Sequence, residues 1–276
     1  MKLEEVERIS LPCAVILSAE LKRWTLLGRF VPKLIGLSRW NRRVRSLLIS
    51  LGTLAHLGIP KKRYRNVNDD PRPDQVVLVE LTSSSSADGE KVRRLQDDFH
   101  ALISVFKPQQ FISRALLEAA ANVIEHAYAD KSCGETMLDP RQRWYATASF
   151  DPNNKSLRFF IYDHGRGIPE SLRAEQSWLE AIMSLRSFVG VGPNDSEMID
   201  TAVDIGRTRT GKNERGKGLR DIVNVVERTG AGYVRIISGK GDYRRFFDGK
   251  VEKAQHGSHI GGTMIEWSIP INAISS

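Results

Sequence analysis

Residues 155–169 read KSLRFFIYDHGRGIP, in which an apolar run leads directly into a turn with two glycines. The apolar run predicts a strand over residues 155–163 that ends at Asp163. A carboxylate in that place can accept a hydrogen bond from an exocyclic amine, and Gly165 and Gly167 let the backbone approach a flat base closely. The alternative interpretation is a plain glycine turn between a strand and a helix.

The surrounding sequence predicts strands and helices that alternate along the chain. A second strand over residues 143–150 is joined to the first by the polar turn 151–154. Further strands are expected over 75–81, 233–238 and 262–269, and helices over 34–56, 88–105, 111–128, 169–187, 196–205 and 218–228. Segment 239–261 is expected to be a polar loop. Helices interleaved with strands indicate an α/β fold, a two-layer α/β sandwich with a mixed sheet.

Along the chain, the first motif lies in the helix predicted over residues 111–128, and the turn at Asp163 is the second. Glu118, Asn122 and His126 are spaced by four residues and therefore lie near one face of that helix. Asn122 offers a hard oxygen ligand to Mg²⁺, and Glu118, one turn away, can orient or deprotonate a nucleophile. His126 is expected to pack or form a hydrogen bond at the edge of such a pocket. A polar stripe on a surface helix would show the same spacing.

The third motif, residues 214–222, reads ERGKGLRDI and places Gly216 and Gly218 at the start of a helix. Unpaired N–H groups at a helix N-terminus form a site for anions. Three cations stand where a polyphosphate would lie, namely Lys212, Arg215 and Lys217. The third motif therefore predicts a phosphate site.

In their order along the chain, the three motifs resemble the GHKL ATPase superfamily, which includes gyrase, MutL, histidine kinases and anti-sigma serine kinases. The resemblance covers about residues 76–270 and implies a Bergerat-type fold that binds ATP and Mg²⁺. It implies that Asn122 binds Mg²⁺, that Glu118 is the general base and that Asp163 recognises the adenine amino group. The other residues that it assigns to the nucleotide site are His126, Gly165, Gly167, Ile168, Lys212, Arg215, Gly216, Lys217, Gly218, Leu219 and Thr263.

The first motif most resembles the anti-sigma factor serine kinase branch, whose partners are of the anti-sigma-antagonist (STAS) type. None of the six histidines is followed by an acidic residue, as the phosphoacceptor of a histidine kinase usually is. Little more than residues 272–276 follows the last predicted strand, so the further domain of gyrase and MutL is not expected. The resemblance also implies that about residues 170–215 form an ATP lid.

The resemblance therefore implies a regulatory protein that hydrolyses ATP or phosphorylates a partner protein on Ser or Thr. The alternative is a non-catalytic module in which ATP orders the lid and creates a docking surface for a protein. Glu118 distinguishes the two, because its carboxylate is required for turnover and not for binding.

Residues 1–75 differ in composition from the nucleotide-binding region expected over 76–276. The chain has 41 Lys and Arg against 33 Asp and Glu, a net charge of +8, and twelve of the basic residues lie within 21–65, where no acidic residue occurs. This mostly helical region contains short stretches that faintly resemble a STAS-like module. Its charge suits an acidic regulator, an anionic membrane surface or nucleic acid, although no nucleic-acid motif accompanies it. A solvated helix face is the alternative.

The remaining composition indicates the cellular compartment. Cys13 and Cys133 are far apart and form no C-x-x-C pair, so neither a disulfide framework nor a cysteine zinc site is expected. No apolar run reaches the roughly 18 to 20 residues that a membrane span needs, and the first five residues lack the basic start of a secretory signal. We expect a cytoplasmic protein with no transmembrane segment, which could form a homodimer.

Overall fold

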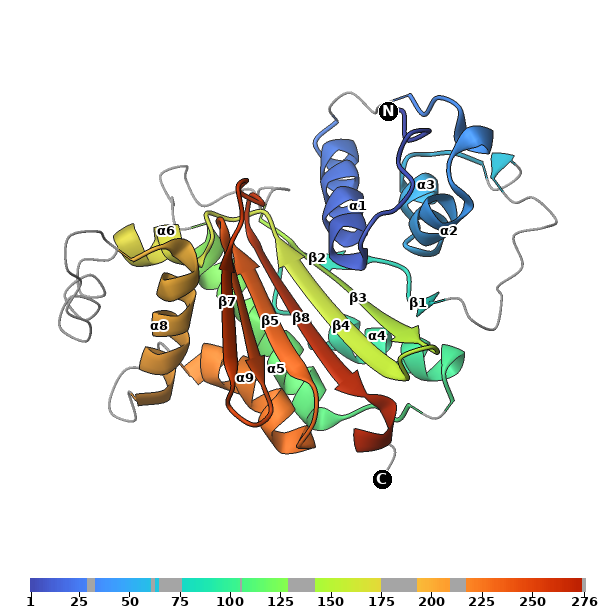
Figure 1. Ribbon diagram of the computed structural model, residues 1–276. Helices are drawn as coiled ribbons and strands as arrows, with labels where there is room; N and C mark the ends of the chain where they lie inside the picture. The colour runs from blue at the N-terminus through green and yellow to red at the C-terminus, as the bar shows by residue number, and fades with distance from the viewer. Residues whose placement is uncertain are drawn as a thin grey trace.

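The computed structural model describes residues 1–28, 33–60, 63–64, 76–104, 106–128, 142–174, 193–208 and 217–274. These residues contain one eight-stranded sheet in the order β1-β3-β4-β8-β5-β6-β7, with β2 also paired to β3 (Figure 1). The strands are β1 (Val77–Leu78), β2 (Thr82–Ser84), β3 (Trp144–Asp151), β4 (Ser156–Asp163), β5 (Tyr233–Ser238), β6 (Gly241–Phe246), β7 (Val251–Gln255) and β8 (Thr263–Pro270).

Every strand pair in this sheet is antiparallel. The expected α/β class is confirmed, but the expectation of a mixed sheet is wrong. Helical patterns between strands indicate a crossover without fixing the direction of the strand that follows. The last strand of the chain, β8, lies between β4 and β5 and runs opposite to both.

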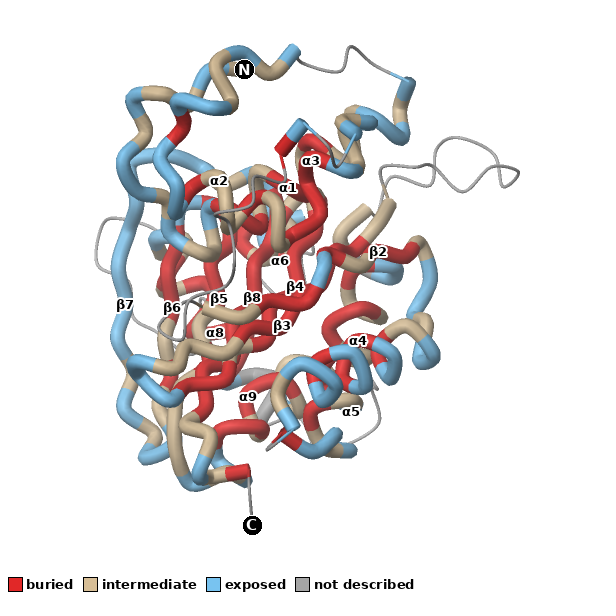
Figure 2. The backbone as a smooth tube through the Cα atoms, turned by 90° about the vertical axis from the view of Figure 1, so that its right-hand side faces the viewer, coloured by how far each residue is buried: buried red, intermediate tan, exposed pale blue. Residues whose placement is uncertain are grey.

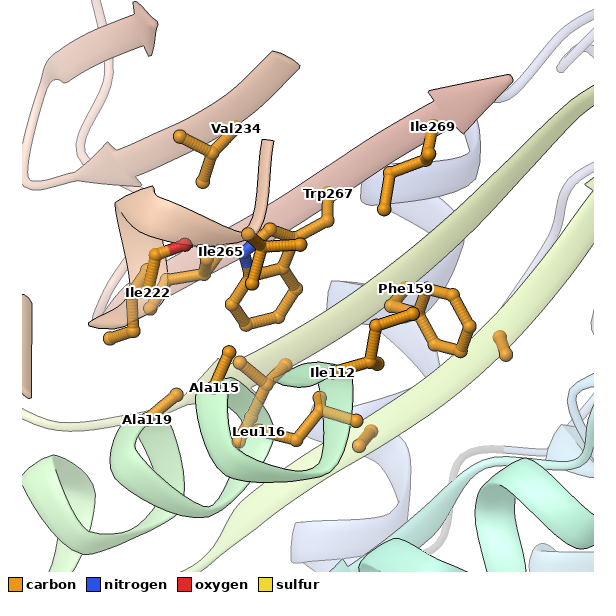
Figure 3. Packing of buried hydrophobic residues seen from close by; sticks show 14 of the residues in the cluster. Ile112, Ala115, Leu116, Ala119, Phe159, Ile222, Val234, Ile265, Trp267 and Ile269 are labelled. Carbon is orange, nitrogen blue, oxygen red and sulfur yellow. Dashed lines mark hydrogen bonds between the residues drawn. The ribbon is translucent and has the colours of Figure 1, made fainter. Parts of the chain in front are cut away.

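Among the described residues, four helices cover one face of the sheet, and two of them carry residues of the first and third motifs. The four are α4 (Gly89–Leu102), α5 (Gln110–Asn122), α8 (Asp195–Thr208) and α9 (Lys217–Thr229), of which α5 and α9 carry those motif residues. They pack against alternate strand residues such as Phe159 and Ile161 of β4. Trp267 of β8 points toward α5, and its indole N–H donates to the carbonyl oxygen of Ile222 in α9 at 2.7 Å (Figure 3). We call this side the first face.

Helices of the N-terminal region pack on part of the opposite, second face. They are α1 (Leu11–Leu26), the 3-10 helix η1 (Leu37–Arg39), α2 (Arg42–Ser50) and α3 (Thr53–His56). Phe160 and Tyr162 of β4 point to this face and join a buried cluster with Ala19 of α1 and Leu48 of α2. The region 1–75 therefore adds a helical layer to the two layers expected, and the central strands are buried on both sides (Figure 2).

The helix expected over residues 34–56 is divided into the three short helices η1, α2 and α3. Gly36 and Gly52 precede η1 and α3 with φ of 65° and 73°, so the chain leaves the right-handed helical conformation at both. Asn41 caps α2 by accepting a hydrogen bond from the N–H of Arg43 at 2.9 Å. Apolar periodicity predicted the type of structure here but not these interruptions.

Segment 239–261, expected to be a polar loop, contains the β6–β7 hairpin. β7 is the outer strand of the sheet and four of its five residues are exposed, so it lacks the apolar alternation that marks a half-buried strand. Ion pairs secure it instead: Arg244 lies 3.6 Å from Glu252, and Lys253 lies 2.8 Å from Asp200 of α8.

The second half of the helix expected over 169–187 lies outside the described residues. Its first part is α6 (Ile168–Ala174). The Gly-, Lys- and Arg-rich residues 209–216 also lie outside the described residues.

We predict that Phe160→Ala lowers the free energy of unfolding by about 3–5 kcal/mol, because a fully buried ring leaves a cavity between the sheet and the N-terminal helices. Urea denaturation measures the loss. The matched control is Phe247→Ala, since Phe247 is 46% exposed, and it should change stability by less than about 0.5 kcal/mol. Equal losses in the two variants would contradict the packing of the second face.

Candidate functional site

The second motif and the last strand meet at one end of the sheet. Asp163 ends β4 and pairs with Thr263 at the start of β8, which pairs in turn with Ser238 at the end of β5. Side chains alternate along a strand, so Asp163 points to the same face as Ile161, which packs in the first-face core. A row of three polar side chains therefore lies on the first face.

The carboxyl group of Asp163 is buried and held by backbone donors. The residue is 5% exposed, and its Oδ1 accepts a hydrogen bond from the N–H of Gly165 at 2.6 Å. Burial raises the pKa of Asp163 to about 7, although the backbone hydrogen bonds from Gly165 and Thr263 act to lower it. Near neutral pH the carboxyl group is therefore present in both its protonated and its ionised form.

Two glycines allow the backbone around Asp163 to come together. A Cβ atom on Gly165 would overlap the Cβ of Ala127, and one on Gly262 would overlap the carbonyl oxygen of Asp163. Gly262 also has a φ of 138°, which L side chains rarely adopt. Both positions therefore require glycine.

Helix α5 continues into a π-helix, η3 (Val123–Ala127), so the predicted helix 111–128 is right in extent and changes type at its end. The carbonyl oxygen of Ala127 accepts a hydrogen bond from the N–H of Arg166 at 3.0 Å. The hydroxyl of Tyr128 accepts one from the N–H of His164 at 3.1 Å. These bonds join the first motif to the turn of the second. Single π-helical turns within α-helices are frequent at functional sites.

The first and third motifs meet at the start of α9. A Cβ atom on Gly218 would lie 3.1 Å from both Oδ1 and Nδ2 of Asn122, and 3.3 Å from Oε2 of Glu118. The two half-buried side chains therefore lie against the first turn of α9, whose N-terminus favours anions. Nη2 of Arg114 lies 2.8 Å from Oδ2 of Asp221 and joins the two helices further along.

The structure thus brings most of the predicted site residues into two connected groups. The first group is Glu118, Asn122 and Gly218, and the second is Asp163, Gly165, Gly167, Ile168 and Thr263. The π-helix and the turn after β4 connect them.

Some predicted site residues have other surroundings or lie outside the description. The side chain of Leu219 packs against the cluster of Leu172, Met198 and Ala202. His126 lies in the π-helix and Lys217 begins α9, but their side chains are outside the described part of the chain. Residues Lys212, Arg215 and Gly216 are outside it entirely.

The predicted lid, residues 170–215, is described only in α6 and α8. Ile199 of α8 packs in the first-face core. Asp195 accepts a hydrogen bond from the N–H of Lys240 at 2.9 Å and lies 2.6 Å from Nη2 of Arg173. These parts are docked on the sheet, and the lid stays a prediction for the rest.

Ser238 is a site residue that sequence reasoning missed. Its Oγ accepts a hydrogen bond from the N–H of Ile168 at 2.9 Å and lies 2.9 Å from Oγ1 of Thr263. The available signal was a polar residue at the end of an apolar strand, the same signal that identified Asp163.

No protein-family model and no curated protein matches the chain. Within the described ranges, no three His, Cys, Asp or Glu side chains gather in a group that could hold a metal ion. None of the helices in those ranges has both the length and the apolar character needed to cross a membrane. The candidate site is therefore defined by its own geometry.

We predict that Gly262→Ala destabilises the protein by about 1–3 kcal/mol more than Gly261→Ala, because a methyl group at 262 would overlap the backbone of Asp163. Gly261 is a matched control. It also has a positive φ, of 71°, but it has open space where its Cβ would lie. Thermal or urea denaturation compares the two variants, and similar losses would contradict the close approach.

A second prediction concerns Asp163→Asn and pH. The pKa of Asp163 is raised from 3.8 to about 7 in the folded protein, so its contribution to stability is present below about pH 4 and is lost as the pH rises to about 7. Relative to Asp163→Asn, the wild type should lose roughly 4 kcal/mol of unfolding free energy over that window. Urea denaturation from pH 3.5 to 8 tests this, and parallel profiles for the two proteins would disprove it.

Proposed function

We propose that this protein binds ATP with Mg²⁺ on a GHKL-type, or Bergerat-type, fold. The observation that carries the proposal is the convergence of three motifs from distant parts of the chain. Gly165 approaches Ala127 at the end of the first motif, and Gly218 approaches Asn122 and Glu118. A surface helix stripe or a plain glycine turn, the alternatives for each motif alone, accounts for neither approach.

The adenine would lie at the Asp163 end of the site. The buried carboxyl group can accept a hydrogen bond from the exocyclic amine, and its pKa near 7 lets it ionise when that donor arrives. Thr263 lies beside Asp163 in the sheet, with its hydroxyl held 2.9 Å from Oγ of Ser238. The turn at Gly165 presents backbone without a side chain, which suits a flat base.

The phosphates would lie at the Asn122 end, against the first turn of α9. The N–H groups of that turn favour negative charge. Asn122 offers a hard oxygen, and Mg²⁺ takes most of its other ligands from phosphate and water, so one or two protein ligands suit it. When bound there, Mg²⁺ would offset the charge of the phosphates. Lys217, the first residue of α9, is a further candidate for this end.

Glu118 lies beside Asn122 and would act as general base. The oxygen of a water, or of a Ser or Thr hydroxyl on a partner, attacks the γ-phosphorus while the bond to the β,γ-bridging oxygen breaks and ADP leaves. The proton of the attacking group passes to Glu118. Following the resemblance to anti-sigma serine kinases, we propose a cytoplasmic regulator that acts on a STAS-type or other acidic protein.

The proposal is tested with ATP labelled on the γ-phosphate and Mg²⁺, with and without cell extract. Asp163→Asn should weaken ATP binding by about 10- to 100-fold, because it removes a charged hydrogen-bond acceptor. Glu118→Gln should bind ATP within about threefold of wild type but lose turnover by a factor on the order of 10²–10⁴. Phosphate release and labelled protein bands distinguish hydrolysis from transfer.

Glu90→Gln is the control, since Glu90 of α4 is exposed and pairs only with Arg94 among the described residues. It should match the wild type in both assays. ATP binding by the wild type without turnover in either condition would leave a nucleotide-gated binding module. No ATP binding at all would overturn the proposal.

A further inference from the structure

His164, the residue after Asp163, turns to the second face of the sheet, away from the proposed nucleotide site. Its side chain is 8% exposed, and its ring centroid lies 5.3 Å from that of Tyr145 and 4.8 Å from that of Tyr162. Its Nε2 lies 2.7 Å from Oε2 of Glu20 in α1. The N-terminal region therefore contacts the turn that holds Asp163.

Glu20 is held in position by its own helix. Arg23 donates from Nε to Oε2 at 3.0 Å and from Nη2 to Oε1 at 2.7 Å, and the indole N–H of Trp24 also donates to Oε1. Burial alone would raise the pKa of Glu20, but the hydrogen bond from Arg23 and the field of His164 lower it. The carboxylate is therefore charged at neutral pH and fixed toward the turn.

The imidazole of His164 is buried and incompletely bonded. Burial lowers the pKa of His164 to about 4, so the ring is neutral near pH 7. Among the described residues Nδ1 has no hydrogen-bond partner, and Nε2 approaches only the carboxylate of Glu20. Buried polar atoms without partners are rare in native proteins. A small movement of the ring would complete a bond from Nε2–H to Glu20.

The backbone of His164, unlike its side chain, is hydrogen-bonded to residues of the proposed nucleotide site. Its N–H donates to the hydroxyl of Tyr128, and the next N–H, that of Gly165, donates to the carboxyl group of Asp163. The orientation of the ring therefore follows from the position of the turn, and the position of the turn is restrained by α1.

We propose that His164 and Glu20 couple the N-terminal region to nucleotide binding, an inference that rests on the proposed function. His164 is a positioning residue. When ATP binds and fixes the Asp163 turn, the imidazole becomes aligned with Glu20. In the other direction, the contact between α1 and His164 through Glu20 holds the turn in the position that binds ATP. Such coupling is reciprocal. A protein that displaced α1 would therefore weaken ATP binding, and the factor would equal that by which bound ATP strengthens the docking of α1 on the sheet.

The test compares Glu20→Gln with Glu90→Gln, which removes the same charge at an exposed site on α4. Glu20→Gln should raise the Kd for Mg²⁺-ATP by a factor on the order of five, whereas Glu90→Gln should stay within about twofold of wild type. In wild type, ATP should slow hydrogen exchange of residues 11–26 and leave the β6–β7 hairpin unchanged. In Glu20→Gln the effect on residues 11–26 should disappear.

A double-mutant cycle with His164→Asn adds a second measurement. Both substitutions remove the same contact, so their effects on Kd should not add. Additive effects, or an equal Kd for Glu20→Gln and Glu90→Gln with exchange of residues 11–26 insensitive to ATP, would overturn the inference and leave the proposed function standing. Failure of the wild type to bind ATP would overturn both.

Discussion

The buried carboxyl group of Asp163 is the constraint on which this end of the molecule depends. Burying an ionisable group is unfavourable unless hydrogen-bond donors surround it. Its donors are backbone N–H groups of Gly165 and Thr263, and a backbone can approach so closely only where no Cβ intervenes, as at Gly165 and Gly262. One buried group thus sets the shape of the turn, the start of β8 and the place where the first motif ends.

Features that depend on short-range spacing were predictable from the sequence. Asp163 follows an apolar strand, and Glu118 and Asn122 share one face of a helix. Features that depend on distant segments were not predictable. Ser238 and Glu20 acquire their partners only when β5 and α1 meet the turn after β4. The direction of the strands and the exposed strand β7 were missed because neither leaves an apolar period in the sequence.

The N-terminal region shows that a segment of different composition can still pack into the same core as the rest of the chain. Its basic residues suggested an independent segment, yet Ala14, Val15 and Ala19 of α1 are fully buried in the cluster on the second face. Small residues let the helix approach the sheet closely, and its longer polar side chains Glu20, Lys22 and Arg23 are only partly buried. As a consequence, the side chains of two consecutive residues, Asp163 and His164, lie on opposite faces of the sheet.

The outer strand β7 has a consequence for how copies of this protein behave at high concentration. Four of its five residues are exposed, and Glu252 on it is charged. At the other edge of the sheet β1 has only two residues. Short or charged edge strands are poor templates for strand addition, because pairing would desolvate the charges or gain few hydrogen bonds. The described sheet can therefore bury its centre densely and still resist growing into fibrous aggregates.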